Sequence, residues 1–141
     1  MAQKYAKLLM NLGNATEALC GTVDSDSELL RRTRREAVAV LAAAGITVAA
    51  KGHDTEQRRH ISIRPIGGKR RGGGSTWQSF ARGASTVETD HLNGEIVLLG
   101  RLHGVPTPAN ALLQRLAAEF ARQHRPPGSI TEPELAAMLP P

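Results

Sequence analysis

The chain has 141 residues, a length that fits one compact domain with a hydrophobic core of its own. Aromatic residues make up only 3 % of it, so the core must consist of Leu, Val, Ile and Ala, which favours close-packed helices over a β-sandwich. The formal net charge of +5 suits nucleic acid, an anionic small molecule or a soluble surface, and charge alone does not choose among them. We therefore expect one all-α domain over residues 1–141.

Composition also excludes several classes of protein. Cys20 is the only cysteine, which rules out an intrachain disulfide and favours the cytoplasm. The longest weakly apolar run, Ala37 to Ala50, is shorter than the ~20 residues that a membrane span needs, and the N-terminus lacks the apolar core of a signal peptide. The five histidines share no ligand spacing, so we expect no metal site. The expectation is a soluble, cytoplasmic protein without membrane contact.

The stretch from Lys7 to Cys20 predicts the first helix. Its apolar residues recur at the three-and-four spacing of a helix face, and Gly21 supplies a stop; they are Leu8, Leu12, Ala15 and Leu19. Beside them Lys7, Asn11 and Asn14 fall at i, i+4 and i+7, so an ammonium and two carboxamides project to the same side. Asn has poor helix propensity, so two of them in one helix suggest that the polar row contacts something other than bulk water. The alternative is an ordinary solvated stripe on an amphipathic helix.

A second helix is predicted from Ser27 to Ala44, closed by Gly45. The residues expected to form its apolar stripe are Leu30, Ala37, Val38, Leu41 and Ala44. Arginines crowd its first half, at positions 31, 32, 34 and 35. They wrap most of the way round a helix and cannot share one recognition face, which favours a solvated or salt-bridged surface.

Residues 46–74 are expected to be an irregular or flexible connection. The glycines of Gly67 to Gly74 indicate a loop, and Lys69, Arg70 and Arg71 make it basic. The alternative is a phosphate site, but the spacing fits neither GxxxxGK[ST] nor a GxGxxG between a strand and a helix. A basic loop is the preferred interpretation.

Four further helices are predicted from their start and stop signals. STWQSFAR, Ser75 to Arg82, predicts a short helix capped by Ser75, ended by Gly83 and anchored to the core by Trp77 and Phe80. Ser85 or Thr86 can cap a long helix to Gly104, in whose first turn Glu88 is favoured by the helix dipole alone. Thr107 as N-cap with Pro108 at N1 starts the next, which Pro126, Pro127 and Gly128 end. Thr131 and Glu134 have capping-box spacing for a last helix, Pro133 to Leu139.

Three segments read together resemble a known family. They are KLLMNLGNATEAL at 7–19, STWQSFARG at 75–83 and VETDHLNGEIVLLGRLHGVPTPAN at 87–110. In this order they are similar to the C-terminal domain of the 2-dehydropantoate 2-reductase (ketopantoate reductase) family, over most of residues 5–120 with 46–74 outside. The resemblance implies a compact bundle of about five to seven helices, like the C-terminal domain of 6-phosphogluconate dehydrogenase.

The family's other domain is not visible in this sequence. In the family an N-terminal α/β domain holds NADPH, whereas no GxGxxG follows a predicted strand here. We therefore expect the dinucleotide-binding domain to be absent, and the chain to be a fragment, a stand-alone relative or one half of a split enzyme.

The resemblance also implies residue roles. Lys7 resembles the general acid that protonates the substrate oxygen, and Asn11 the asparagine that contacts substrate and steadies that lysine. Asn14 lies one position from a second substrate asparagine, Ser75 resembles the serine that binds the substrate carboxylate, and Glu88 the acid facing the lysine. Two departures stand against the family pattern, a serine at position 79 where Asp is common and one extra residue before Glu88.

Two functions follow as expectations. The first is the substrate-binding, catalytic-lysine domain of an NADPH-dependent reductase of 2-keto acids in the pantothenate pathway, inactive without a separate dinucleotide-binding domain and forming a homodimer. The alternative is a basic helical binding or assembly module without catalytic activity, in which the clusters Arg31 to Arg35 and Lys69 to Arg71 contact nucleic acid. We rank it second because no nucleic-acid motif and few aromatic residues for base stacking are present.

Overall fold

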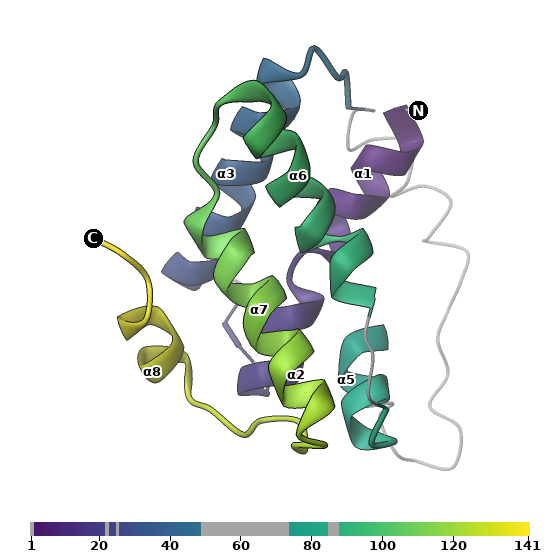
Figure 1. Cartoon of the computed structure of the whole chain (residues 1–141), viewed down its shortest axis with the longest axis vertical. Coiled ribbons are helices and arrows are strands. Elements are labelled where there is room, and N and C mark those ends of the chain that lie inside the picture. Colours follow the sequence, from purple (N-terminus) through teal and green to yellow (C-terminus); the bar gives the residue numbers. More distant parts are fainter. Residues whose placement is uncertain (1, 22, 25, 49–73, 85–87) are drawn as a thin grey trace.

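The computed structural model describes residues 2–21, 23–24, 26–48, 74–84 and 88–141 (Figure 1). Its elements are α1 (Ala2–Asn11), α2 (Asn14–Cys20), α3 (Glu28–Ala43), α5 (Ser75–Ala81), the 3-10 helix η2 (Glu88–His91), α6 (Asn93–His103), α7 (Pro108–Arg122) and α8 (Glu132–Ala137). All regular structure in these ranges is helical, which confirms the predicted fold class. The glycine-rich loop and its three basic residues lie outside the described ranges.

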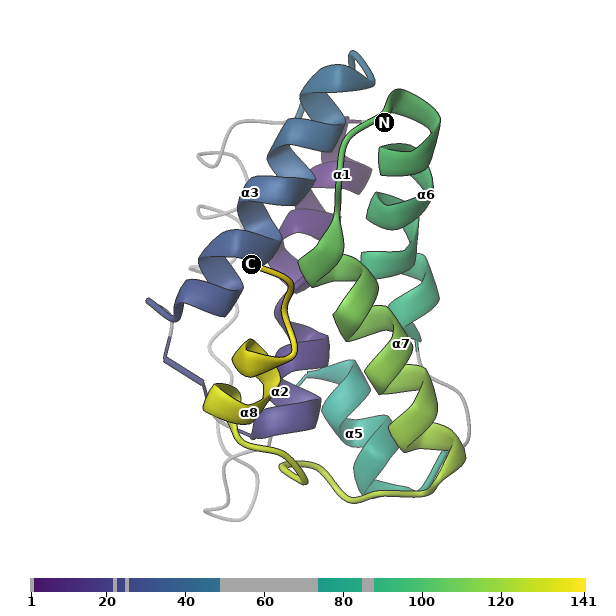
Figure 2. The same ribbon diagram turned by 60° about the vertical axis from the view of Figure 1, so that its left-hand side comes forward.

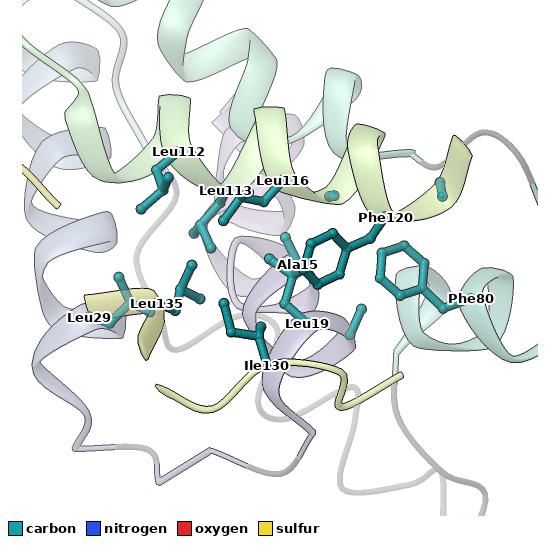
Figure 3. Packing of buried hydrophobic residues seen from close by; sticks show 13 residues of the cluster. Ala15, Leu19, Leu29, Phe80, Leu112, Leu113, Leu116, Phe120, Ile130 and Leu135 are labelled. Atoms are coloured by element: carbon teal, nitrogen blue, oxygen red, sulfur yellow. The ribbon is translucent and has the colours of Figure 1, made fainter. Parts of the chain in front are cut away.

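The helices enclose two hydrophobic clusters. Figure 2 shows α3 and α6 in the upper part of the molecule with α1 behind them, and α7 continuing into the lower part, where α2, α5 and α8 lie. The first cluster lies where α7 meets α2, α5 and α8, and its large members include Leu19, Phe80, Leu113, Phe120 and Leu135 (Figure 3). The second joins α1 to α3 and α6 through Tyr5, Leu8, Leu12, Val40, Leu41 and Ile96. No helix in the described ranges is long and apolar enough to cross a membrane.

The first predicted helix is two helices, and the single-helix prediction is wrong. Its apolar face is buried as expected, since Leu8, Leu12 and Leu19 are each at most 4 % exposed. The chain nevertheless breaks after Asn11, and α2 begins anew with Gly13 as its N-cap. Glycine costs helix stability in an interior position, and here the break lets α2 join the first cluster while α1 joins the second. Asn14 therefore does not continue the row of Lys7 and Asn11 along one helix.

The second predicted helix is confirmed as α3, with a shifted apolar stripe. Ser27 is the N-cap and its hydroxyl accepts a hydrogen bond from the Leu30 N–H. Val38, expected in the core, is 50 % exposed. The buried residues of the helix are Leu29, Thr33, Ala37, Val40 and Leu41.

The later helices follow their start and stop signals with two corrections. Gly74, not Ser75, is the N-cap of α5, and Ser75 is its first helical residue. The predicted long helix is interrupted at Leu92, where η2 ends and α6 begins, while Ser85 and Thr86 lie outside the described ranges. Leu102, near the end of α6, is 68 % exposed.

The last two helices are confirmed. Thr107 is the N-cap of α7, and Pro108 is its first residue. The capping box of α8 is formed, because the Thr131 hydroxyl accepts from the Glu134 N–H and the Glu134 carboxylate accepts from the Thr131 N–H.

Candidate substrate site

Lys7 and Asn11 lie one turn apart on α1, beside its buried face. Lys7 is exposed and Asn11 is half-buried, whereas Tyr5 and Leu8 point into the second cluster. An exposed ammonium beside a half-buried carboxamide leaves both groups able to contact a molecule that covers α1.

Two contacts to α6 hold α1 in place. The Tyr5 hydroxyl donates to Glu95 Oε1 at 3.0 Å, and Lys4 Nζ lies 3.1 Å from the same oxygen. Partial burial of Glu95 opposes its ionisation, but the hydrogen bonds from Lys4 and Tyr5 outweigh that effect and lower the pKa of the carboxyl. These two contacts, which we call the Glu95 tether, set the orientation of the helix that carries Lys7 and Asn11.

Asn14 lies against Gly74, the residue before Ser75, although 60 positions separate Asn14 from Gly74 in the sequence. A Cβ atom placed on Gly74 would lie 2.8 Å from Asn14 Oδ1 and 3.0 Å from its Cγ, so the carboxamide rests directly on the Gly74 backbone. Ser75 is the next residue and is exposed. The start of α2 thus packs directly on the residue before α5, and Gly74 permits the approach because it lacks a side chain.

Glu88 is placed only through its backbone. It is the first residue of η2, a 3-10 helix that contacts α5, α6 and α7. Its side chain lies outside what the structure describes, so the expected approach of its carboxylate to Lys7 stays a prediction.

A buried polar network links α3, α6 and α7, and the sequence analysis did not predict it. Asn93 and Asn110 are both fully buried, and Asn93 Nδ2 donates to Asn110 Oδ1 at 3.0 Å. Asn110 Nδ2 donates in turn to Glu36 Oε2 at 2.9 Å and to the Thr33 carbonyl at 3.1 Å. The only available signal was an Asn within an apolar helical stretch at each position, which does not name the partner.

Three of the four arginines of α3 form ion pairs, in line with the solvated or salt-bridged surface expected for them. Arg31 and Arg35 both pair with Glu28, and Arg32 lies 3.8 Å from Glu36. This pairing offsets part of the positive charge and provides no single basic face, which weakens the nucleic-acid alternative. The residues described by the structure also include no group of three His, Cys, Asp or Glu side chains suited to a metal ion.

The described residues do not fit a dinucleotide. They contain no strand that leads through a glycine-rich turn into a helix, the unit that cradles a pyrophosphate. What they offer instead is an ammonium and a carboxamide on α1, a second carboxamide at the start of α2 and a hydroxyl at the start of α5, donor groups of the kind that suit a small carboxylate. The class defined by fold and site is therefore an all-helical domain with polar donor side chains on α1, α2 and α5.

Comparison with known proteins identifies the family. The profile described as ketopantoate reductase PanE/ApbA C terminal matches residues 1–121, and the chain belongs to this family. It is similar to a PanE/ApbA family ketopantoate reductase from Ralstonia eutropha JMP134, solved by crystallography, with 29 % sequence identity and a TM-score of 0.63. The similarity covers 85 % of this chain and 41 % of that one, so this chain spans less than half of that protein's length. No curated protein matches it.

Proposed function

We propose that this chain supplies the substrate-binding and proton-donating half of an NADPH-dependent reductase that converts a 2-keto acid to a 2-hydroxy acid, with 2-dehydropantoate as the first candidate. Membership of the family over residues 1–121 supports the reaction class. The single structural observation that supports the proposal is the contact of the Asn14 carboxamide with Gly74, the residue before Ser75.

Lys7 is the proposed general acid. Reduction of a keto carbon leaves an alkoxide, and a positioned ammonium both stabilises the developing negative charge and delivers the proton. Asn11, one turn further along α1, is proposed to hydrogen-bond the substrate and to hold Lys7. Glu88 is proposed to face the ammonium and to favour its charged form.

Ser75 and Asn14 are the proposed carboxylate contacts. A hydroxyl and a carboxamide N–H each donate one hydrogen bond to a carboxylate, and donors at fixed positions orient the keto carbon. Because α2 and α5 are both anchored in the first cluster, through Leu19 and Phe80, these donors sit on a rigid base.

The hydride is proposed to come from NADPH bound to a separate dinucleotide-binding domain, and the chain alone is proposed to be inactive. We further propose a cytoplasmic protein that forms a homodimer. The exposed Leu98 and Leu102 on α6, 57 % and 68 % exposed, are compatible with such association. Light scattering that gives the mass of a monomer at high concentration argues against the dimer.

The test combines this chain with a dinucleotide-binding domain of the family and follows NADPH oxidation with 2-keto acids. Lys7→Ala should lower kcat at least about 100-fold, because a general acid contributes on the order of 10²–10⁴-fold. Arg34→Ala is the control, the loss of an exposed cation on α3, and should change kcat less than about threefold. Turnover that survives Lys7→Ala contradicts the assigned role.

Binding is tested on the chain alone. Addition of 2-dehydropantoate should shift the NMR signals of the Asn11 and Asn14 side-chain amides, and Ser75→Ala should weaken this binding several-fold. Shifts that instead map to the arginine-rich half of α3 contradict the proposed site.

A further inference from the structure

The 3-10 turn that carries Glu88 and the start of α6 each make one polar side-chain contact with α7. Gln114 Nε2 donates to Asp90 Oδ1 at 2.8 Å, and Asn93 Nδ2 donates to Asn110 Oδ1 at 3.0 Å. Asn110 and Gln114 are four residues apart and therefore lie on the same face of α7. This face meets η2 and the start of α6 at two points one turn apart.

The Gln114 side chain lies close to the backbone of α6. A Cβ atom on Gly94 would lie 2.9 Å from Gln114 Nε2, so the Gln114 amide passes directly over the first turn of α6. The anchor behind it is firm, because Asn110 is fixed to α3 through Glu36 and the Thr33 carbonyl. The Gln114 side chain thus extends from α7, which is fixed to α3, across the first turn of α6 to η2.

The turn itself has little internal support. A four-residue 3-10 helix makes few hydrogen bonds, and their geometry is poorer than in an α-helix. The Leu92 N–H donates to the Thr89 carbonyl at 3.2 Å, where η2 ends. Side-chain contacts to a neighbouring helix therefore contribute a large part of what sets the orientation of η2.

We propose that Gln114 is a positioning residue: its hydrogen bond to Asp90 orients η2 and, through the turn, sets where Glu88 stands in the substrate site. This inference rests on the proposed function for the role of Glu88, whereas the hold on the turn is independent of it. Gln114 contacts neither substrate nor cofactor in this scheme and acts only through Asp90.

A charge series tests the hydrogen bond rather than the volume of the side chain. Gln114→Glu keeps the shape but sets a carboxylate against Asp90, and Gln114→Lys keeps a donor. Asp90→Asn combined with Gln114→Glu exchanges donor and acceptor and should restore the bond. Gln123→Glu is the matched control, since Gln123 donates to Glu119 Oε1 at 3.3 Å further along the same helix.

Amide NMR on the isolated chain reads the turn directly. Gln114→Glu should shift the Glu88 amide signal and speed hydrogen exchange at Leu92 by a factor on the order of five, the worth of one ordinary hydrogen bond. Gln114→Lys and the exchanged pair should stay near wild type, and Gln123→Glu should change neither signal. Wild-type signals in Gln114→Glu, or no recovery in the exchanged pair, would overturn the proposal.

Turnover with the dinucleotide-binding domain separates this inference from the proposed function. Gln114→Glu should lower kcat about fivefold at nearly constant KM, and the exchanged pair should recover it, a pattern that loss of stability alone does not produce. If the NMR signals move in Gln114→Glu and recover in the exchanged pair while kcat stays at the wild-type value, Gln114 does orient η2 but the proposed role of Glu88 is wrong.

Discussion

The carboxylate of Glu36 on α3 caps the start of α7 by accepting hydrogen bonds from Asn110, at 3.1 Å from its backbone N–H and at 2.9 Å from its side-chain amide. The same carboxylate accepts from the Ala109 N–H at 2.9 Å. Thr107 occupies the N-cap of α7 but makes no side-chain capping bond. An acid from another helix thus does the work that the local sequence assigns to a threonine, and it links α3 to α7.

Glu36→Ala should lower the free energy of unfolding by about 2–3 kcal/mol, because it leaves charge-assisted donors without their acceptor. The measurement is urea denaturation followed by circular dichroism. Glu28→Ala is the control, since its pairs with Arg31 and Arg35 are exposed and worth less than about 1 kcal/mol. Equal losses in the two variants would show that Glu36 is no cap.

Gly100→Ala should destabilise the domain although alanine is the better helix former. A Cβ atom there would lie 2.7 Å from the Val105 carbonyl oxygen and 2.8 Å from Thr107 Cγ2, so the turn between α6 and α7 would have to move. We expect a loss of about 1–3 kcal/mol in thermal or urea unfolding. Gly13→Ala is the control, with a nearest contact of 3.4 Å and an expected change between zero and a small gain. A more stable Gly100→Ala would refute the close approach.

The tether of Glu95 to Lys4 and Tyr5 should make stability depend on pH in the acid range. The pKa of Glu95 is lowered below its ordinary value of 4.5, so its contribution is fully present above that value and is lost as pH falls through the folded-state pKa. The difference in unfolding free energy between wild type and Glu95→Gln should therefore be constant near neutral pH and shrink below about pH 4.5. A difference that does not change between pH 3 and pH 7 would count against the tether.

Cys20 should react slowly with a thiol reagent in the folded protein. Burial, helped by the charges of Glu132 and Glu134, raises the pKa of the Cys20 thiol to about 11. At pH 8 such a thiol is about 0.1 % thiolate, against roughly a quarter for an ordinary cysteine with a pKa near 8.5. Labelling with a chromogenic disulfide should be more than about 10-fold slower in native protein than in urea, and equal rates would contradict the burial.

Local signals in the sequence were sufficient for most helix ends. Gly104 ends α6 in the left-handed region with φ of 70°, and Thr131 and Glu134 close the capping box of α8. Each of these depends on hydrogen bonds within four residues, which a pattern contains in full. The interruptions at Gly13 and Leu92 were missed because the apolar periodicity runs on through both.

The candidate site divides in the same way. The family assignment is confirmed, whereas the roles of Lys7, Asn11, Asn14, Ser75 and Glu88, which follow from the resemblance, stay predictions. Their spatial relation is a different matter, since Asn14 meets Gly74 only because α2 and α5 pack on one cluster. Nothing in the sequence indicated that Asp90 would contact Gln114 or that Asn93 would contact Asn110.

By itself, the sequence determined that this chain is helical, where most of its helices end, and to which family it belongs, because those properties follow from periodicity, caps and an ordered set of motifs. Only the tertiary structure decided that an acid on α3 caps α7, that the polar row of the first segment is divided between two helices, and which helix holds the turn of Glu88. The reason is physical: such contacts join residues up to 74 positions apart, and their geometry exists only after the two clusters have formed.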